Sequence, residues 1–430
     1  HHDDVRPRRV RSIDTLGAAA TSYLYDNRGN RKSEVVAGAT TTYAYDDADR
    51  LTGVFFDDTQ IAEAYLLRGD GARVGRRMYT GATSVPPDFA TAPANGTLVA
   101  DETYSYDGAD GLSAIDDAVS VTTTPATTDA KGRVTAFGAN TFAWDVADRM
   151  VSSTTPLGTT SYEYDYQGWR TRKQSASEDT SYVWGRSSIE SELDNASGIA
   201  RNYSHGDGII LGVGDDVFGH DALGSPVYRV DINTGSMTTT LFDAWGAIRS
   251  APPTGPPQSA GENQTGFTGH TNDVETGLVY AQARYLDPST GRFLSLDPSP
   301  GTLSDPFSTQ GFTYPSSNPT RYRDPNGRDV IDFAEGAGGS YAAQTLLPLT
   351  PWGAVLSSYD TIKRGHQAYE KGEFGSFLGE TVLNATPVGQ AIDGVTKVKR
   401  SIQGIRDTVE KSGVEGALTL PADEGGRSEE

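Results

Sequence analysis

Cysteine is absent from this chain of 430 residues. Its absence excludes disulfide bridges and cysteine-ligated zinc sites, and it leaves the redox environment of the protein undefined. Basic residues are scarce relative to acidic ones, and the formal net charge is −21. This balance argues against a nucleic-acid-binding surface, which needs clustered Lys and Arg side chains. It favours a soluble and self-repelling exterior instead.

Aliphatic residues are also few. Only 36% of the residues are hydrophobic, whereas the chain has 49 glycines and 21 tyrosines. This composition favours β-structure rich in turns, and the length allows roughly two or three domains. No signal peptide is visible, but the chain starts with His1 and His2 rather than Met, so we expect a fragment or a processed product.

A short motif recurs between residue 20 and about residue 200. It consists of two aromatic residues separated by one position, an Asp, two variable residues, Gly or Asp, and then Arg or an apolar residue. Close copies are YLYDNRGNR (Tyr23–Arg31), YAYDDADRL (Tyr43–Leu51), YSYDGADGL (Tyr104–Leu112), FAWDVADRM (Phe142–Met150) and YEYDYQGWR (Tyr162–Arg170). Weaker copies are YLLRGDGARV (Tyr65–Val74), DAKGRV (Asp129–Val134) and YVWGRSSI (Tyr182–Ile189).

The motif predicts a β-hairpin. Aromatic residues at i and i+2 lie on one face of a strand, and the following Asp begins a turn by accepting hydrogen bonds from the next backbone amides. Gly29 and Gly168 supply a positive φ, which Asp49, Asp110 and Asp148 tolerate less easily at the same place. One hairpin cannot bury its aromatic face, so the repeats are predicted to stack into a continuous sheet. The repeated aspartates are therefore interpreted as architectural.

These residues resemble the YD-repeat, or Rhs, family. The family includes bacterial polymorphic toxins, the C component of insecticidal toxin complexes, wall-associated proteins and animal teneurins. HDALGSPVYRVD (His220–Asp231), FDAWGAI (Phe242–Ile248) and the long segment from Gly266 to Pro298 resemble further family motifs, the last being similar to the Rhs repeat-associated core. The resemblance covers about residues 20 to 330. It implies a mainly β fold in which stacked hairpins form a large curled sheet, part of a hollow shell, and the Rhs core plugs one end.

We predict three regions on this basis. Residues 1–200 form the YD-repeat array, residues 201–329 form the Rhs core, and residues 330–430 form a helical region with a disordered end. In the last region apolar residues recur at helical spacing, and Leu383–Val395 resembles the helical linkers found between an Rhs core and its toxin. Its only histidine, His366, is expected to pack on a helix, so the region does not look like a complete enzyme.

In the family the core works as an aspartyl autoprotease that cuts once and releases the C-terminal piece. Such a site needs two carboxylates that share one proton, because like charges a few ångström apart cannot both ionise. The resemblance assigns the two catalytic roles to Asp297 and Asp324. Cleavage would fall between Arg328 and Asp329.

Further residues match the core motif, but departures from it keep a structural alternative open. Arg292 and Asn318 match family positions, whereas Pro300 interrupts the first Asp-Pro motif and an Arg replaces the usual Leu before the cut. Asp305 is an alternative first carboxylate. Under the structural alternative every Asp-Pro pair, including Asp287-Pro288, is only a turn, because Asp followed by Pro suits type I geometry.

No metal or cofactor is expected. His220 and His270 are 50 residues apart and lack a ligand-spaced partner, so we assign them hydrogen-bonding roles. Asp215 and Asp216 are not surrounded by a calcium loop of known spacing.

The resemblance implies the C-terminal part of a bacterial, secreted or surface-associated Rhs toxin protein, whose wall and plug enclose an effector. Implied partners are this effector as cargo, a longer N-terminal repeat portion or a partner shell chain, secretion machinery and an immunity protein, with no nucleic acid bound by the array. About eight repeats are expected to be too few to close a shell alone. Two alternatives remain: a non-enzymatic surface scaffold or adhesin, and a membrane-active tail, since residues 336–359 carry no charge.

Overall fold

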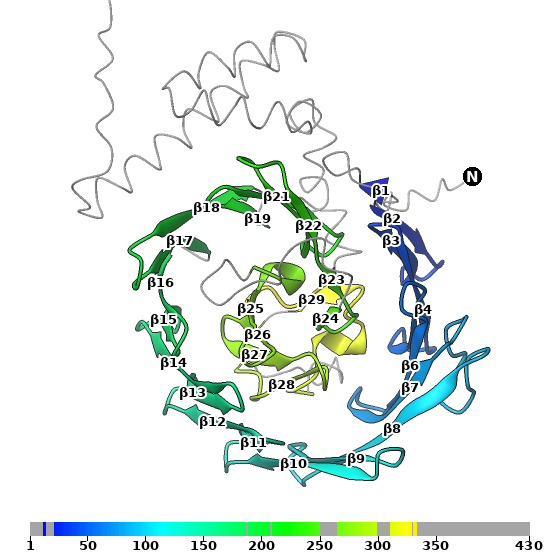
Figure 1. The fold of residues 1–430 in the computed structure, drawn as a ribbon. Coiled ribbons are helices and arrows are strands. Elements are labelled where there is room, and N and C mark those ends of the chain that lie inside the picture. The colour runs from blue at the N-terminus through cyan, green and yellow to red at the C-terminus, as the bar shows by residue number, and fades with distance from the viewer. Residues whose placement is uncertain are drawn as a thin grey trace, which may run out of the picture. The chain divides into compact units, whose positions relative to one another are not determined.

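The computed structural model describes residues 12–13, 21–185, 188–206, 209–249, 265–298, 310–328 and 330–332. These residues belong to the first of two compact units, His1–Thr345. A large antiparallel sheet curls around a smaller inner part of the chain (Figure 1). The predicted mainly β fold, with hairpins stacked into a curled sheet, is confirmed. The predicted helical region lies outside the described residues, except for residues 330–332.

The large sheet, which we call the wall, has 22 strands. Every strand pairs with the next one in the sequence, as expected for stacked hairpins. The first half comprises β1 (Ser12–Ile13), β2 (Thr21–Tyr25), β3 (Arg31–Val36), β4 (Ala39–Tyr45), β5 (Leu51–Phe56), β6 (Ile61–Leu67), β7 (Arg73–Thr80), β8 (Thr97–Tyr106), β9 (Leu112–Asp117), β10 (Thr122–Thr128) and β11 (Val134–Phe137). The second half comprises β12 (Asn140–Trp144), β13 (Met150–Thr155), β14 (Gly158–Tyr164), β15 (Arg170–Gln174), β16 (Asp179–Trp184), β17 (Ile189–Asp194), β18 (Ala200–Gly206), β19 (Ile209–Val213), β20 (Asp216–His220), β21 (Pro226–Asp231) and β22 (Met237–Thr239).

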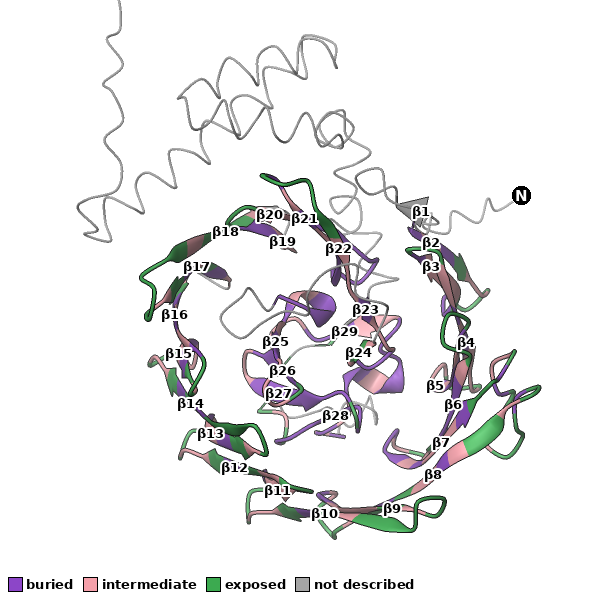
Figure 2. Cartoon of the chain, viewed as in Figure 1, coloured by how far each residue is buried: buried purple, intermediate pink, exposed green. Residues whose placement is uncertain are grey.

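The first aromatic residue of each repeat faces inward and is buried. Tyr23 is 1% exposed, whereas its neighbour Leu24 is 65% exposed. Figure 2 shows the same division along the wall, with buried residues toward the inside and exposed ones at the outer hairpins. The prediction that aromatics at i and i+2 share one face is therefore confirmed at this repeat, where Tyr25 is also partly buried.

A register shift precedes the second aromatic residue in repeat after repeat. It lies between Leu24 and Tyr25 in the first repeat and between Glu163 and Tyr164 in a later one. The same shift occurs in the strand pairs that end at Tyr45, Leu67, Tyr106, Trp144, Trp184, His205 and His220. A β-bulge bends a strand and increases its twist, so the recurring bulge accounts for the curl of the wall.

The aspartate turns have the geometry that the motif predicts. Asp145 Oδ1 accepts hydrogen bonds from the backbone N–H of Ala147 (2.8 Å) and of Arg149 (3.0 Å). The residue three places after the Asp has a positive φ, whether it is Gly29 (105°) or Asp148 (63°). Each turn therefore satisfies its backbone amides internally with one carboxylate.

Two side chains of the motif also join neighbouring repeats. The hydroxyl of Tyr164, the second aromatic of its repeat, donates to the carbonyl of Met150 (2.7 Å) in the preceding hairpin. The guanidinium of Arg149 donates to the carbonyl of Asp165 (2.9 Å) in the next turn. Trp144, Trp184 and Tyr45 repeat the first contact, and Arg50 and Arg133 repeat the second. The Arg therefore clamps adjacent turns together, a role beyond opening the return strand.

The inner part follows the wall in sequence. Its elements are β23 (Leu241–Phe242), β24 (Ile248–Arg249), the 3-10 helix η1 (Phe267–Gly269), β25 (Thr271–Asp273), β26 (Leu278–Ala281), β27 (Arg284–Asp287), β28 (Arg292–Phe293), the 3-10 helix η3 (Pro315–Ser317), β29 (Tyr322–Arg323) and β30 (Ile331–Asp332). Strands β25–β28 form a small antiparallel sheet, and β29 pairs with β30. We call the described residues between 265 and 332 the inner module.

The inner module and the wall share one apolar core. Tyr280 and Tyr285 of the inner module pack with Phe142, Met150 and Tyr162 of the wall. A continuous cluster of this kind buries the aromatic face that a single hairpin leaves exposed. The wall strands continue to Thr239, beyond residue 200, and the domain boundaries predicted at residues 200 and 329 stay predictions.

Candidate functional site

The inner module lies against the aspartate turns of the wall. Asn318 Nδ2 donates to the side chain of Asn30 (3.1 Å) and to the carbonyl of Asp49 (2.6 Å), which lie in the first two turns. Further turns are reached by Ser317 at Gly71 (2.8 Å), Gln310 at Asp70 (3.1 Å), Arg292 at Asp110 (2.8 Å) and Arg323 at Leu223 (3.3 Å). Because these contacts are spread over turns far apart in the wall, they position the inner module at the edge of the wall where the aspartate turns lie.

Asp297 and Asp324 are brought together by one arginine. Arg284 Nη2 lies 2.8 Å from Asp297 Oδ2 and 2.7 Å from Asp324 Oδ2. Two carboxylates that contact the same nitrogen atom must lie close to each other. The structure therefore places side by side the two residues to which the resemblance assigns catalysis.

The arginine itself is held rigidly. Arg284 is 3% exposed, its Nη1 donates to the carbonyl of Gly311 (3.1 Å), and its guanidinium carbon lies 3.6 Å from the ring centre of Phe293. Burial lowers the pKa of Arg284, and the two aspartates oppose this shift. Removing the charge of this group from water is costly unless it is paired, so Arg284 requires at least one of the two carboxylates.

Asp324 belongs to a turn that repeats the wall geometry. Its Oδ1 accepts the N–H of Asn326 (3.4 Å) and of Arg328 (2.9 Å), and Gly327 has a φ of 73°. The i+2 and i+4 amides and the positive φ are those of the wall turns. Asp324 therefore both begins a turn and pairs with Arg284, so its role in the turn and its pairing with Arg284 are compatible.

The predicted cleavage position comes directly after this turn in the sequence. Arg328 is exposed, and its backbone N–H is held by Asp324 Oδ1 and by Asn326 Oδ1 (2.9 Å). Asp329, on the other side of the predicted cut, lies outside the described residues, as does Asp305. Arg328 is therefore an exposed residue whose backbone amide is bound by the buried carboxylate of Asp324.

In the described arrangement both carboxylates contact the same cation, Arg284. A cation between two carboxylates favours the ionised form of both, whereas a dyad needs one proton between them. Asp297 is 18% exposed and Asp324 is fully buried, so only one carboxylate of the pair faces solvent. For self-cleavage, Arg284 would have to release one of them.

The two supporting residues of the core motif lie elsewhere. Arg292 contacts the wall turn at Asp110 and lies over the rings of Tyr106 and Phe312, and burial lowers its pKa. Asn318 is fully buried between the first two turns. Both residues dock the inner module on the wall, and neither contacts the aspartate pair in the interactions given above.

The histidines have structural partners. His270 Nε2 lies 2.8 Å from the backbone carbonyl of Asp324, and burial lowers the pKa of the imidazole. Burial likewise lowers the pKa of His220 to about 4. Asp216 pairs with Arg229 (2.5 Å). Within the described ranges no cluster of three or more His, Cys, Asp or Glu side chains could hold a metal ion.

Sequence analysis missed Arg284 and a second buried arginine. Arg170 of the wall pairs with Asp273 of the inner module through two contacts (2.6 and 3.0 Å), and both side chains are almost fully buried. Lys173, also buried, contacts Asp273 (3.4 Å) and Glu178 (2.9 Å). One feature of the sequence could have indicated the buried role of Arg170. This charged residue occupies the motif position that is apolar in other repeats, as at Leu51 and Met150.

The comparison with protein families agrees with the repeat geometry. The RHS Repeat model matches residues 144–180, which contain two of the aspartate turns described above. Over these residues the chain is similar to the RHS repeat family. The resemblance inferred from the aromatic–Asp motif is thereby confirmed.

Curated proteins are similar in sequence to about half of the chain. It is 32% identical over 216 residues to the tRNA3(Ser)-specific nuclease WapA of Bacillus spizizenii and 30% identical over 214 residues to the tRNA nuclease WapA of Bacillus subtilis. Each alignment covers 47% of this chain but only 9% of the WapA protein. The chain therefore spans a small part of the length of these relatives.

Solved structures are also similar to this chain. The crystal structure of TcdB2-TccC3-Cdc42 has 17% sequence identity and a TM-score of 0.44, covering 75% of this chain and 19% of that one. The Tc holotoxin pore of Photorhabdus luminescens has 15% identity and a TM-score of 0.34, covering 75% and 20%. Among the described residues of our chain, no helix is long and apolar enough to cross a membrane.

Proposed function

We propose that this chain is the C-terminal part of a bacterial Rhs/YD-repeat toxin protein, in which wall and inner module enclose an effector and the inner module cuts the chain after Arg328. The pairing of Asp297 and Asp324 on Arg284 supports the cleavage step. The similarity of residues 144–180 to the RHS repeat family supports the toxin context, as do relatives named as tRNA nucleases.

The proposed cleavage uses the two carboxyls in different states. Arg284 first releases one aspartate, which takes up a proton. The ionised aspartate then removes a proton from a water molecule, whose oxygen bonds to the carbonyl carbon of Arg328. The protonated aspartate donates its proton to the nitrogen of Asp329 as the peptide bond breaks. The products are a new carboxyl end at Arg328 and a new amino end at Asp329.

The intact mass of the purified chain tests this step. We expect wild type to yield two fragments that meet between Arg328 and Asp329, and Asp324→Asn to remain whole. Asparagine keeps the oxygen that accepts the Arg328 amide, so the turn should survive the change. Asp287→Asn is the matched control, because Asp287 is another buried Asp-Pro residue whose Oδ1 accepts a backbone amide (2.9 Å). A wild-type chain that remains uncleaved under all conditions would contradict the proposal.

The proposed cargo and partners follow from the relatives and not from the described residues. They are the chain's own C-terminal effector, a longer repeat portion or partner shell chain, secretion machinery and an immunity protein, in a secreted or cell-surface setting. The described strands already surround the inner module in one turn (Figure 1). Size-exclusion chromatography tests the need for a further shell part, since a stable monomer of this chain would argue against it.

A non-enzymatic scaffold is the second candidate. It is favoured by the full engagement of Asp324, whose oxygens bind a turn and an arginine at the same time. Such a scaffold would stay uncut and would present the outer wall surface to a partner. The mass measurement above separates the two candidates.

A further inference from the structure

The two ends of the wall meet through side chains. The backbone N–H of Ala37 in the β3–β4 hairpin donates to the hydroxyl of Tyr228 on β21 (2.9 Å). The N–H of Ala222 donates to the hydroxyl of Tyr23 on β2 (2.7 Å). In the described part of the chain no strand pairing joins β22 to β1 or β2. We call this joint, formed by strands β2–β4 and residues 221–249, the seam.

Apolar and ionic contacts complete the seam. Val36 packs with Val227, Tyr228 and Leu241 from the other end of the sheet. Arg249 forms an ion pair with Asp58, and its guanidinium lies 3.9 Å from the ring centre of Phe56. An antiparallel strand ladder has two backbone hydrogen bonds at every second residue pair, whereas the seam depends on separate side chains. It is therefore the place where the ring of strands separates with the fewest broken contacts.

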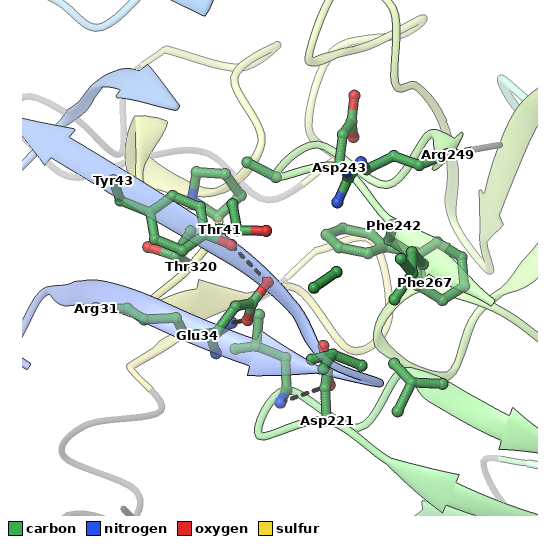
Figure 3. Close-up of a pocket in the computed structure, with 17 residues that line it drawn as sticks. Arg31, Glu34, Thr41, Tyr43, Asp221, Phe242, Asp243, Arg249, Phe267 and Thr320 are labelled. Atoms are coloured by element: carbon green, nitrogen blue, oxygen red, sulfur yellow. Dashed lines mark hydrogen bonds and ion pairs between the residues drawn. The ribbon is translucent and has the colours of Figure 1, made fainter. Parts of the chain in front are cut away.

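A small cavity lies inside the seam (Figure 3). Its volume of about 30 Å³ is enough for one or two water molecules. Ionisable groups from both ends of the wall line it, namely Arg31, Glu34, Asp221, Asp243 and Arg249. Arg31 pairs with Glu34 (2.5 Å), and Glu34 also accepts the hydroxyl of Tyr43 (2.7 Å).

Asp221 and Asp243 are repeat aspartates that have become buried. Each accepts two backbone amides in a turn of the wall type. In the open turns these bonds lower the pKa, as for Asp107, where they are the largest cause. In the seam burial outweighs them: it raises the pKa of Asp221, and it raises that of Asp243 to about 6.

The charged and titratable groups around the two carboxyls come from several elements. Asp221 is faced by Tyr23 and Tyr25 of β2, by Arg31 and Glu34 of β3, and, through the carbonyl of Leu223, by Arg323 of β29. Asp243 is faced by Glu63 and Tyr65 of β6, by Arg76 of β7 and, across the cavity, by Arg249 of β24. Neither carboxyl has an ion pair among the salt bridges described here, unlike Glu34 or Asp58.

We propose that the seam is the joint at which the wall opens, and that acid holds it closed while neutral pH loosens it. A protonated carboxyl stays buried in the narrow cavity at little cost, whereas an ionised carboxyl without a paired cation requires water. Opening the seam supplies that water. The joint would thus couple access to the interior to the pH around the protein, whether or not the chain cuts itself.

The sign of the effect follows from the direction of the shift. The folded-state pKa of Asp243 lies above its ordinary value of 3.8, so closure is fully stabilised below about pH 4 and weakens as the pH rises through 6. The two values differ by about two pH units, which corresponds to about a hundredfold change in the opening equilibrium if the open state restores the ordinary value.

Hydrogen exchange of the full chain at pH 5 and pH 7.5, corrected for intrinsic exchange rates, tests the proposal. We expect peptides of β3, β4 and β21 to lose about tenfold in protection between pH 5 and pH 7.5, because part of the hundredfold change falls below pH 5, while peptides of β12–β15 change little. Asp243→Asn keeps an oxygen for the two turn amides but cannot ionise, so it should abolish most of the pH dependence. Asp145→Asn, in an open wall turn, is the matched control and should keep it.

Two results would overturn the proposal. One is an equal loss of protection in β12–β15, which would indicate a global effect of pH. The other is an undiminished pH dependence in a variant that carries both Asp221→Asn and Asp243→Asn. If the variants fail to fold, the wild-type protein alone still tests the proposal. Protection of the seam strands that does not depend on pH would contradict it.

Discussion

Two buried arginines, one in the wall and one in the inner module, bind carboxylates in different ways. Arg170 of the wall binds one carboxylate, Asp273, through two hydrogen bonds, and aromatic rings surround it, including Tyr280 at 4.2 Å. Arg284 of the inner module shares a single nitrogen atom between Asp297 and Asp324. The first site is closed to solvent on every side, whereas Asp297 opens the second site to water.

The difference separates a structural ion pair from a site poised for chemistry. A bidentate pair in a dry environment has one stable arrangement, so it fixes the inner module on the wall. An arginine divided between two carboxylates has a second arrangement available, in which it keeps one partner and the other takes a proton. The inner module therefore combines one bidentate ion pair with the wall and one arginine that contacts two carboxylates.

Removing the structural arginine should have the largest effect. Arg170→Met leaves Asp273 buried with only the longer contact to Lys173 (3.4 Å). We expect the free energy of unfolding to fall by about 3–5 kcal/mol, because a broken buried pair leaves an uncompensated charge. Urea unfolding measures this loss. Arg149→Met, at a partly exposed pair on the rim, should cost less than about 1 kcal/mol, and equal losses would remove the distinction.

The second arginine should show a smaller loss that depends on pH. Arg284→Gln leaves two carboxylates side by side, so one of them must take up a proton. We expect unfolding free energy to fall by about 2 kcal/mol at pH 8 and to recover in part at pH 5. Arg284→Lys keeps the cation and should lose less at pH 8. A loss that is the same at both pH values would show that the two carboxylates are not coupled through Arg284.

The hydroxyl of Tyr164 allows a test of the contact between the wall and the inner module near Arg170. Tyr164 donates to the carbonyl of Met150 and lies 2.9 Å from the hydroxyl of Tyr285, which is near Arg170. Tyr164→Phe should cost about 1–2 kcal/mol by urea unfolding, because buried partners lose their hydrogen bonds. Tyr166→Phe is the matched control: this side chain is 92% exposed, and the change should have almost no effect.

The smallest effect is expected for an aspartate that begins a turn without belonging to a carboxylate pair. Asp145 caps a wall turn with the geometry of Asp324 but has no second carboxylate on its arginine. Asp145→Ala should cost about 1 kcal/mol at pH 7, whereas exposed Asp47→Ala should cost little. Hydrogen bonds to the backbone and to Arg149 lower the pKa of Asp145. Its contribution is therefore present above about pH 4 and is lost as the pH falls through the folded-state value, which a pH series of unfolding curves checks.

Local structure was readable from the sequence to a large extent. The aromatic positions, the aspartate turn and the positive φ at Gly29 follow from contacts within a few residues, and the structure agrees with each. The bulge before Tyr25 was not predicted, because the motif alone does not show how many residues oppose it on the next strand. The hydrogen bond from Trp184 to the carbonyl of Arg170, which joins neighbouring hairpins, was missed for the same reason.

The candidate site was readable only in part. The Asp-Pro motifs pointed to Asp297 and Asp324, but nothing in their spacing indicated that Arg284 would lie between them. Arg292 and Asn318 were assigned to the core motif, and their contacts with wall turns depend on residues about 180 and 270 positions away.

The repeat, its hairpin and the resemblance to the Rhs/YD-repeat family could all be derived from the sequence alone. These properties depend on short-range hydrogen bonds and on side chains two to four residues apart. Only the tertiary structure decided which aspartates become buried, since the same turn is open at Asp145 and enclosed at Asp243. It also decided which arginine pairs with which carboxylate, because that choice depends on how the curled sheet brings distant segments together and excludes water from between them.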